Sequence, residues 1–456
     1  MVPSLQLHNT LSRRKEPFAP LEEGHVRMYV CGPTVYQRIH VGNARPLVVF
    51  DVLFRLLRHL FPRVTYVRNI TDVDDKIIAE ARRNGEAIEV LTERTIAAFH
   101  EDTRALLCLA PTHEPRATRH IADMIRLIAR LIARGCAYAA DGHVLFHVPS
   151  MPAYGCLSGR SREDQIAGAR VEVAPYKRDP ADFVLWKPSA GDEPGWDSPW
   201  GRGRPGWHIE CSAMAEHYLG VPFDIHGGGL DLVFPHHENE IAQTCCAHGL
   251  ERMARFWVHN GFVTMAEEKM SKSLGNILTV AEALERAPGE AVRFWILTAH
   301  YRAPLDFTEE ALRRAKRVLD RFYLALEKLP GGDRGEIEPA FLEALADDLN
   351  TPRALAVLHE LLNRLHRASS AAEREEVAGR LRASAALLGL LGQDPAAWLR
   401  GGTGGLDETR IEALLAERAE ARRKRDFATA DRIRDELARA GIVIEDTPQG
   451  TIWRRA

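Results

Sequence analysis

Two short motifs carry side chains suited to chemistry on a nucleoside triphosphate. The tetrapeptide His-Val-Gly-Asn at 40–43 places an imidazole, His40, two residues before a glycine. At the start of a helix, this pair could stabilise charge on a reacting α-phosphate. The pentapeptide Lys-Met-Ser-Lys-Ser at 269–273 could fold Lys269 and Lys272 over a triphosphate and neutralise a leaving pyrophosphate. The first motif alone also fits a surface turn and the second a solvated basic loop, but together they favour ATP-dependent catalysis.

A third group of residues is suited to binding a metal ion. In Pro-His-His-Glu-Asn-Glu at 235–240, a following helix would place His236 and Glu240 on one face, at positions i and i+4. Two cysteine thiolates from elsewhere could complete a tetrahedral site. The spacing does not choose between His236 and His237, and a histidine pair at a helix start is more often structural than metal-binding. From the residues alone, both interpretations stay open.

The elements that must position the first motif form an α/β pattern. Residues 26–31 predict an apolar strand, which Gly32 and Pro33 end, and residues 46–60 have the apolar spacing of a helix. The motif at 40–43 is therefore expected in the loop between them. Another strand is expected at 64–70, and helices at 77–107 and 117–134. This alternation predicts a parallel α/β sheet.

The later segments predict three further regions. Residues 137–204 combine a hairpin around the Asp-Gly pair at 141–142 with a stretch rich in Pro, Gly and Trp, which is typical of an insertion. Strand-like segments at 223–226 and 256–264 are expected to rejoin the sheet as its second half. Beyond residue 308 the period is almost entirely helical, which predicts a helical bundle, a linker and a small terminal domain. The breaks in this pattern lie at 330–332 and 401–405.

The composition limits the possible classes of protein. Of 456 residues, 45% are apolar and 27% charged, which is ordinary for a folded soluble chain of several domains. There is no apolar run long enough to span a membrane, and residues 1–17 carry charges where a signal peptide needs an apolar stretch, so a cytosolic protein is expected. Seven irregularly spaced cysteines indicate no disulfide framework. The formal net charge of −3 means that a nucleic-acid partner must be argued from local features.

Two glycine-rich segments match other enzymes by spacing only. His-Gly-Gly-Gly at 226–229 is similar to an esterase oxyanion loop, but the chain has no Gly-x-Ser-x-Gly nucleophile motif, which excludes the hydrolase interpretation. Gly-x-Gly-x-x-Gly at 201–206 has dinucleotide-binding spacing, yet it follows Ser-Pro-Trp and contains Pro205, so a loop is expected there.

The motifs at 40–43 and 269–273 are similar to the HIGH and KMSKS signatures of class I aminoacyl-tRNA synthetases, and the chain resembles the cysteinyl-tRNA synthetase family over essentially its whole length. Asn43 stands where the first signature has its second histidine. The other segments that carry the resemblance are 28–36, 67–76, 206–214, 234–240, 348–355 and 442–455.

The resemblance implies an α/β fold in which a Rossmann-type parallel-sheet catalytic domain with an insertion is followed by an all-α helical bundle and a small C-terminal anticodon-binding domain. The implied regions are the first half of the catalytic domain (1–115), a connective insertion (116–204), the second half of the catalytic domain (205–262), the KMSKS loop with its connecting region (263–307), the helical bundle (308–400) and the anticodon-binding domain (406–456).

The resemblance also implies a zinc site. The ligands would be Cys31, Cys211, His236 and Glu240, with one Zn²⁺ per subunit. A thiol bound to Zn²⁺ is deprotonated and binds strongly, whereas the hydroxyl of serine is a harder and less acidic ligand. Coordination would therefore select cysteine without a separate editing domain. The remaining cysteines, expected to be packing residues, are Cys108, Cys136, Cys156, Cys245 and Cys246.

By the same resemblance, L-cysteine is activated with ATP and Mg²⁺ and then transferred to tRNA(Cys), with His40 and Lys272 stabilising the phosphoryl transition state and Lys269 supporting the loop. The implied ATP-binding residues are His40, Gly42, Asn43, Gly228, Gly229 and Lys272. The implied amino-acid site consists of Gly32, Thr71, Trp207 and Asp231, where packing is the alternative for Trp207 and a tight turn for the glycines.

Residues that could read the anticodon lie near the C-terminal end. Arg422, Asp431 and Asp446 are the implied contacts, because Arg and Asp can pair with the exposed edges of unstacked bases. The alternative for the basic run at 422–425 is a solvated helix face.

The terminal region also argues against the related cysteine ligase of mycothiol biosynthesis, which lacks it, and the intact motifs argue against a catalytically silent relative. A monomer is expected.

Overall fold

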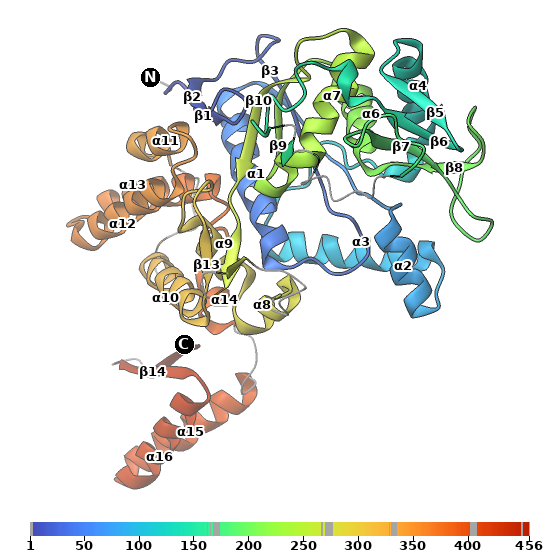
Figure 1. Ribbon diagram of the computed structural model, residues 1–456. Coiled ribbons are helices and arrows are strands. Elements are labelled where there is room, and N and C mark those ends of the chain that lie inside the picture. Colours follow the sequence, from blue (N-terminus) through green and yellow to red (C-terminus); the bar gives the residue numbers. More distant parts are fainter. Residues whose placement is uncertain are drawn as a thin grey trace.

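The computed structural model describes residues 3–161, 163–164, 166, 174–265, 268–269, 277–327, 329, 335–401, 408–447 and 450–455. Its centre is a four-stranded parallel sheet with the strand order β10-β9-β3-β4 (Figure 1). The strands are β3 (His25–Val30), β4 (Arg63–Arg68), β9 (Phe223–Gly229) and β10 (Ala254–Asn260). The segments expected at 223–226 and 256–264 therefore do join the first two strands, as the second half of one sheet.

One helix follows the first strand of each half. α1 (Val41–Leu60) connects β3 to β4, and α7 (Glu238–His248) lies between β9 and β10 in the chain. Because β4 lies on one side of the central β3-β9 pair and β10 on the other, the strand order reverses between β3 and β9. In open parallel sheets, ligands bind at the carboxyl ends of the strands at such a reversal point. The ends of β3 and β9, at Val30 and Gly229, therefore mark the edge where a site is expected.

α1 begins earlier than the sequence pattern indicated. The pattern predicted a helix from Pro46 and a loop at 40–43, whereas the helix begins at Val41 and contains Pro46. His40 is the capping residue, with φ −101° and ψ 168°. The Val41 backbone N–H donates to the Leu278 carbonyl oxygen at 2.9 Å. This long-range pairing fixes the start of the helix, and no local pattern could have shown it.

The single helix expected at 77–107 is two helices. α2 (Asp75–Asn84) ends at Gly85, which has a φ of 65°, and α3 (Ile88–Ala105) begins after a short turn. A left-handed residue cannot continue an α-helix, and glycine adopts that conformation without a steric cost. The prediction of one helix was wrong because Gly85 ends α2 and the apolar spacing does not show this break.

The insertion contains an antiparallel sheet of order β5-β6-β7-β8. Its first hairpin turns at Asp141 and Gly142, whose φ values of 47° and 75° suit a two-residue turn, so the predicted hairpin is confirmed. The expected loop at 201–206 is wrong in part, because β8 there pairs with Trp186 and Lys187 of β7. The elements of this region are η1 (Ala117–Arg119), α4 (Ile121–Ala133), β5 (Ala137–Ala140), β6 (His143–Phe146), η2 (Val148–Ser150), β7 (Phe183–Pro188) and β8 (Gly203–Pro205), and α6 (Trp207–Leu219) follows it.

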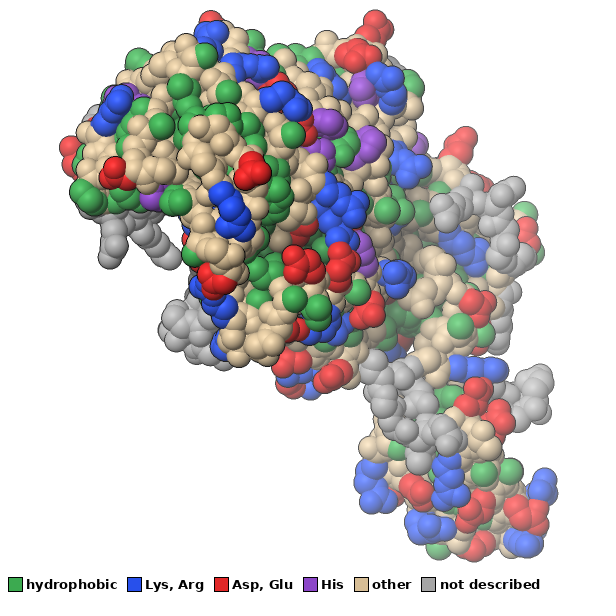
Figure 2. Space-filling model, turned by 90° about the vertical axis from the view of Figure 1, so that its right-hand side faces the viewer, with side chains coloured by type: hydrophobic (Ala, Val, Ile, Leu, Met, Phe, Trp, Pro, Cys, Tyr) green, Lys and Arg blue, Asp and Glu red, His purple; other side chains and the backbone are tan. Residues whose placement is uncertain are grey.

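The chain after residue 308 is helical, as predicted, up to a terminal hairpin that the pattern did not indicate. α15 (Glu408–Arg423) and α16 (Phe427–Arg439) pack with β14 (Ile442–Thr447) and β15 (Gly450–Arg455), and this unit projects from the rest of the molecule (Figures 1 and 2). The breaks expected at 330–332 and 401–405 lie, except for Gly401, outside the described residues. Among the helices that are described, none has the length and apolar character needed to cross a membrane.

The remaining elements are β1 (Gln6–Asn9), β2 (Arg14–Pro17), η3 (Leu230–Leu232), η4 (Val233–His237), β11 (Val263–Met265), β12 (Glu268–Lys269), α8 (Val280–Arg286), α9 (Gly289–Leu297), β13 (Leu305–Phe307), α10 (Glu309–Leu326), α11 (Pro339–Ala346), α12 (Thr351–Arg367), α13 (Ala371–Leu387) and α14 (Pro395–Arg400). One apolar core joins α1 and α9 to the helices α10 to α13, and a second lies between the insertion, α6 and α7.

Candidate functional site

A cleft of about 340 Å³ opens at the carboxyl ends of β3 and β9, where the strand order reverses. Its walls come from the loop after β3, the start of α1, the start of α6, the turn η3 and the chain between β10 and β11. The residues in these walls that the sequence assigned to the site are Cys31, Gly32, His40, Gly42, Asn43, Trp207, Gly229 and Asp231. One cleft therefore collects candidate residues from both halves of the sheet.

His40 lies in this cleft at the positive end of the α1 dipole. The side-chain oxygen of Asn43 accepts a hydrogen bond from the His40 backbone N–H at 3.3 Å, which closes the first turn of the helix. A Cβ added to Gly42 would lie 2.8 Å from two atoms of the His40 ring. Glycine at this position therefore lets the imidazole pack against a helix start that favours anions.

Both flanks of the second motif are tied down by backbone pairing, and one of them reaches the first motif. At the start of the motif, its first residue, Lys269 of β12, pairs with Thr264 of β11. After it, the Val280 backbone N–H donates to the Ile39 carbonyl oxygen at 3.0 Å. Residues 270–276, which include Lys272, lie outside the described residues. The chain that follows the second motif is thus paired with the chain next to His40.

Four potential metal ligands meet beside the cleft. Cys31 directly follows β3, Cys211 lies on α6, His236 in the turn η4 and Glu240 on α7. The two Sγ atoms are 3.6 Å apart, the Cys31 Sγ atom is 3.5 Å from Glu240 Oε1, and the same oxygen is 3.1 Å from His236 Nε2. Tetrahedral zinc, with bonds of about 2.0 to 2.3 Å, places its ligand atoms about 3.3 to 3.8 Å apart. The donor types and their spacing therefore fit one zinc ion.

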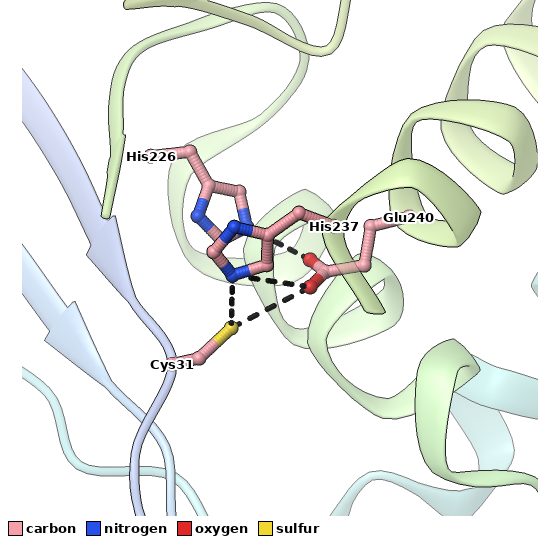
Figure 3. Close-up of side chains that lie close together, drawn as sticks. All are labelled: Cys31, His226, His237 and Glu240. Atoms are coloured by element: carbon pink, nitrogen blue, oxygen red, sulfur yellow. Dashed lines mark hydrogen bonds and ion pairs between the residues drawn. The ribbon is translucent and has the colours of Figure 1, made fainter. Parts of the chain in front are cut away.

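A second set of donors overlaps the first (Figure 3). It shares Cys31 and Glu240 and adds His226 of β9 and His237 of η4. His237 Nε2 lies 3.3 Å from the Cys31 Sγ atom, and His226 Nε2 lies 2.8 Å from Glu240 Oε2. No sequence motif marks His226 as a ligand, because only the folding of β9 next to α7 brings it close to Glu240. Since the sets share two donors, one tetrahedral ion uses either set but not both.

The histidines on η4 each contact another histidine. His236 Nδ1 is 2.9 Å from His208 Nδ1, and His237 Nδ1 is 2.8 Å from His259 Nε2. Burial lowers the pKa of His236 and of His237 well below the usual histidine value, and burial raises the pKa of the nearby cysteine thiols. The imidazoles are therefore neutral donors, whereas the thiols need a bound cation in order to ionise.

Thr71 lies behind the cleft wall in a buried chain of hydrogen bonds. Its hydroxyl donates to Glu210 Oε2 at 2.8 Å, and Asn69 Nδ2 donates to Thr71 Oγ1 at 3.3 Å. Asn69 Oδ1 in turn accepts from the Gly32 backbone N–H at 2.9 Å. Burial raises the pKa of Glu210 well above the usual range. Neither Asn69 nor Glu210 was predicted to have a role, although they fall in the segments 67–76 and 206–214 that carry the resemblance.

Trp207 forms part of the cleft wall beside the metal-ligand candidates. Its ring stacks on that of His236, with 4.2 Å between ring centroids and 20° between ring planes. Trp207 is the first residue of α6 and is 37% exposed, so it covers the site and is not a core packing residue.

The glycines at the end of β9 make room for polar side chains. A Cβ on Gly228 would lie 2.9 Å from the His237 ring, and one on Gly229 would lie 2.5 Å from Asp231 Oδ1. Gly229 and Asp231 line the cleft, whereas Gly228 is buried behind it. A side chain at Gly228 would therefore clash with the buried His237 ring, whereas one at Gly229 would displace the Asp231 carboxylate.

Two of the three anticodon candidates lie together. Arg422 donates to Asp446 Oδ2 at 2.6 Å, and Arg418 binds both oxygens of the same carboxylate at 2.8 and 2.9 Å. Hydrogen bonds, chiefly from Arg418, hold the pKa of Asp446 well below its usual range. Asp431, on α16, instead pairs with Arg434 at 3.0 Å. Arg418 was not among the predicted contacts.

The packing role expected for the other cysteines is wrong for one of them. Cys136 and Cys245 are buried and Cys108 and Cys246 are half-buried, but Cys156 is exposed. Cys156 lies in a surface turn, where its Sγ atom is 3.7 Å from Glu238 Oε1.

Comparisons with known proteins cover the whole of this architecture. The family described as "tRNA synthetases class I (C) catalytic domain" matches residues 17–317, "DALR domain" matches residues 340–392, and "Cysteinyl-tRNA ligase anticodon binding domain" matches residues 404–454. A Rhodospirillum rubrum protein named cysteine--tRNA ligase is 61% identical over 458 residues, covering 99% of this chain and 100% of that protein. A Rhodospirillum centenum protein of the same name is 62% identical over 456 residues, with the same coverage of each chain.

Solved structures share the fold at low sequence identity. The Agrobacterium radiobacter K84 LeuRS, in its complex with tRNA and LeuAMS, gives a TM-score of 0.58 at 12% identity and covers 81% of this chain and 84% of its own. The Mycobacterium tuberculosis methionyl-tRNA synthetase, in complex with methionyl-adenylate, gives a TM-score of 0.55 at 16% identity and covers 80% and 89%. From its matched domains and its relatives over almost the full length, this chain belongs to the cysteine-tRNA ligase family of class I aminoacyl-tRNA synthetases.

Proposed function

We propose that this protein joins L-cysteine to tRNA(Cys), consuming ATP and releasing AMP and diphosphate. The observation that carries the proposal is that two chemically different groups meet at one cleft. His40 caps a helix there in a position suited to a phosphate, and a set of thiol, imidazole and carboxylate donors beside it is suited to a metal that binds sulfur.

In the first step, a carboxylate oxygen of cysteine attacks the α-phosphorus of ATP. The bond from that phosphorus to the oxygen bridging to the β-phosphate breaks, so cysteinyl-adenylate forms and diphosphate leaves with its electron pair. His40 stabilises the negative charge that builds on the α-phosphate, while Lys269 and Lys272 neutralise the leaving diphosphate. Gly42, Asn43 and the strand end at 228–229 shape the nucleotide site, and Mg²⁺ accompanies ATP.

The amino acid is held at the other side of the same cleft. We assign the zinc site to Cys31, Cys211, His236 and Glu240, because this set has the two soft thiolate donors that zinc favours. A bound Zn²⁺ supplies a Lewis acid that takes a thiolate far better than a hydroxyl. Trp207 covers the His236 side of the pocket, Asp231 takes the ammonium group of the substrate, Gly32 contributes from the cleft wall, and Thr71 contributes from behind it.

In the second step, a ribose hydroxyl of the terminal nucleotide of tRNA attacks the carbonyl carbon of the adenylate, and AMP leaves. Recognition of the tRNA takes place partly in the projecting terminal unit, where Arg422, Asp431 and Asp446 would read base edges. Figure 2 shows basic and acidic side chains intermixed on this unit, which suits pairing with individual bases better than a uniform field for the phosphate backbone. We further propose that the protein works in the cytoplasm as a monomer.

The activity is tested by ATP–pyrophosphate exchange with the full-length protein. Cysteine should support exchange, serine should not, and chelation of zinc should abolish the exchange with cysteine. Adding tRNA(Cys) should then yield cysteinyl-tRNA. Cysteine activation without charging of tRNA would point to a cysteine ligase with another acceptor, and no exchange with any amino acid would refute the enzymatic proposal.

Breaking the buried chain of hydrogen bonds through Thr71 should weaken the binding of cysteine. Replacing Thr71 by Val removes the hydroxyl between Asn69 and Glu210 and leaves buried polar atoms without a partner. Because such a loss costs about 1–3 kcal/mol, the KM for cysteine should rise about 10-fold or more, with little change in the KM for ATP. The control is Thr95→Val, since the Thr95 hydroxyl is equally buried but donates only to its own helix, at Leu91. Equal effects of the two substitutions would contradict a role for Thr71 at the site.

Removing the Arg422 side chain from the terminal unit should impair only the charging of tRNA. Arg422→Ala should lower kcat/KM for tRNA by about 10- to 100-fold, which corresponds to the loss of hydrogen bonds to a charged group. Pyrophosphate exchange should keep the wild-type rate, because the cleft is not touched. Arg423→Ala is the matched control, since Arg423 pairs with Glu420 on the exposed helix face. If both variants charge tRNA equally well, Arg422 is not an anticodon contact.

A further inference from the structure

A second cluster of potential metal ligands lies away from the cleft, between α4 and α6. His120 directly precedes α4, Asp123 lies in the first turn of that helix, and His217 lies near the end of α6. Asp123 Oδ2 is 2.7 Å from His120 Nδ1 and 3.4 Å from His217 Nδ1, and the three donor atoms all lie within 4.8 Å of one another. Figure 2, which views the side on which α4 lies in Figure 1, shows histidine side chains on this face.

The 3.4 Å between Asp123 Oδ2 and His217 Nδ1 is the spacing of ligands on a single ion, whereas the 2.7 Å contact between Asp123 and His120 is a hydrogen bond, which would lengthen when an ion binds. Bonds of about 2.0–2.2 Å from zinc to histidine nitrogen and carboxylate oxygen place neighbouring ligand atoms about 3.3–3.6 Å apart in a tetrahedron. Both histidines present Nδ1 to the same carboxylate oxygen, Oδ2 of Asp123. Arg126 donates to the other oxygen, Oδ1, and so orients the carboxylate with Oδ2 toward the imidazoles.

The surroundings support the ligand role of His120. His120 is only 7% exposed, and its other ring nitrogen, Nε2, is 3.2 Å from the Tyr218 hydroxyl. A hydrogen bond to the second nitrogen of a histidine fixes the ring orientation, which is the usual support for a metal-binding imidazole. Asp123 and His217 also line a cavity of about 180 Å³, which leaves room for a water molecule as a further ligand.

We propose that His120, Asp123 and His217 bind a divalent transition-metal ion of the zinc class. Two imidazoles and one carboxylate suit such an ion and differ from the donors beside the cleft, which include thiols. Arg126 and Arg130, in the wall of the same cavity, repel a cation, so this site is the weaker of the two. The ion joins the start of α4 to the end of α6, the helix that carries Trp207 and Cys211. The proposal does not depend on the catalytic function.

The test is the zinc content of the full-length protein, measured by elemental analysis after equilibrium dialysis against buffered free zinc. The wild type should bind one zinc ion at low free zinc and a second at higher free zinc. His217→Ala and Asp123→Asn should each lose the second ion and keep the first. His248→Ala is the matched control, because His248 contacts Glu216 and Arg130 of the cavity wall but not Asp123, and it should keep both ions.

Thermal unfolding gives a second measurement. The higher zinc concentration should raise the Tm of the wild type and of His248→Ala but not that of His217→Ala, since an ion that binds only the folded state stabilises it. A single zinc ion in the wild type, or the same second ion in His217→Ala and Asp123→Asn, would overturn the proposal. Loss of the second ion in His248→Ala as well would also overturn it, because the ion would then not be bound by this set of three residues.

Discussion

Replacing Cys211 by alanine should remove the bound zinc and lower kcat/KM for cysteine in pyrophosphate exchange by about 10³-fold or more. The thiolate is a strong zinc donor, and the free energy of zinc binding in such sites exceeds ten kcal/mol, so losing one of four ligands has a large effect. Metal analysis of the purified variant and exchange assays at saturating ATP measure the two quantities separately.

The same variant separates the two overlapping donor sets, because Cys211 belongs to only one of them. If Cys211→Ala keeps its metal, the ion is bound by Cys31, His226, His237 and Glu240, and the assignment made above is wrong. The matched control is Cys245→Ala. Cys245 is a buried cysteine on α7, outside both sets, and its loss should leave metal content and activity close to the wild type.

Replacing His40 by alanine should slow adenylate formation by about 10²- to 10³-fold, which is the usual loss when one donor that stabilises a developing charge is removed. The effect should fall on kcat, with little change in the KM for cysteine, because the imidazole acts on the α-phosphate and not on the amino acid. Single-turnover formation of cysteinyl-adenylate measures the step directly.

The control for this prediction lies at the other end of the same helix. His59, in the last turn of α1, is exposed and distant from the cleft walls, so His59→Ala should retain the wild-type rate. A comparable loss in both variants would mean that His40 acts through the stability of α1. An unchanged rate in His40→Ala would remove His40 from the chemistry.

Local sequence patterns predicted the elements of the sheet but not all of their ends. The strands and the two-residue hairpin turn were found because apolar runs and the Asp-Gly pair are local signals. The start of α1 was missed because it is set by backbone pairing with Leu278, which is far away in the sequence. The terminal hairpin was missed because its short strands follow two clearly helical segments and have no long apolar run of their own.

The site was predictable only where a motif carried it. His40 came from a motif, the metal candidates came from a motif and from the resemblance, and the structure places them in the cleft or beside it. Spacing could not separate His236 from His237, because the chain before α7 forms the wider turn η4 and both imidazoles reach Glu240. Asn69 and Glu210 lie in segments that carry the resemblance, but no pattern singled them out, since buried hydrogen-bonded side chains leave no periodic signal.

The carboxylate of Asp446 has a consequence for how a base would be recognised. Arg418 binds it through two nitrogens and is nearly buried, whereas Arg422 is half exposed and binds it through one. On the proposed function, an incoming base must compete with Asp446 for Arg422, while Arg418 keeps the carboxylate in place. A base with the right acceptors forms hydrogen bonds to Arg422 in place of the ion pair that it breaks. A base without these acceptors breaks the ion pair and forms nothing in its place. The ion pair between Arg422 and Asp446 thus lowers the affinity for every anticodon, but it lowers the affinity for a non-cognate anticodon more.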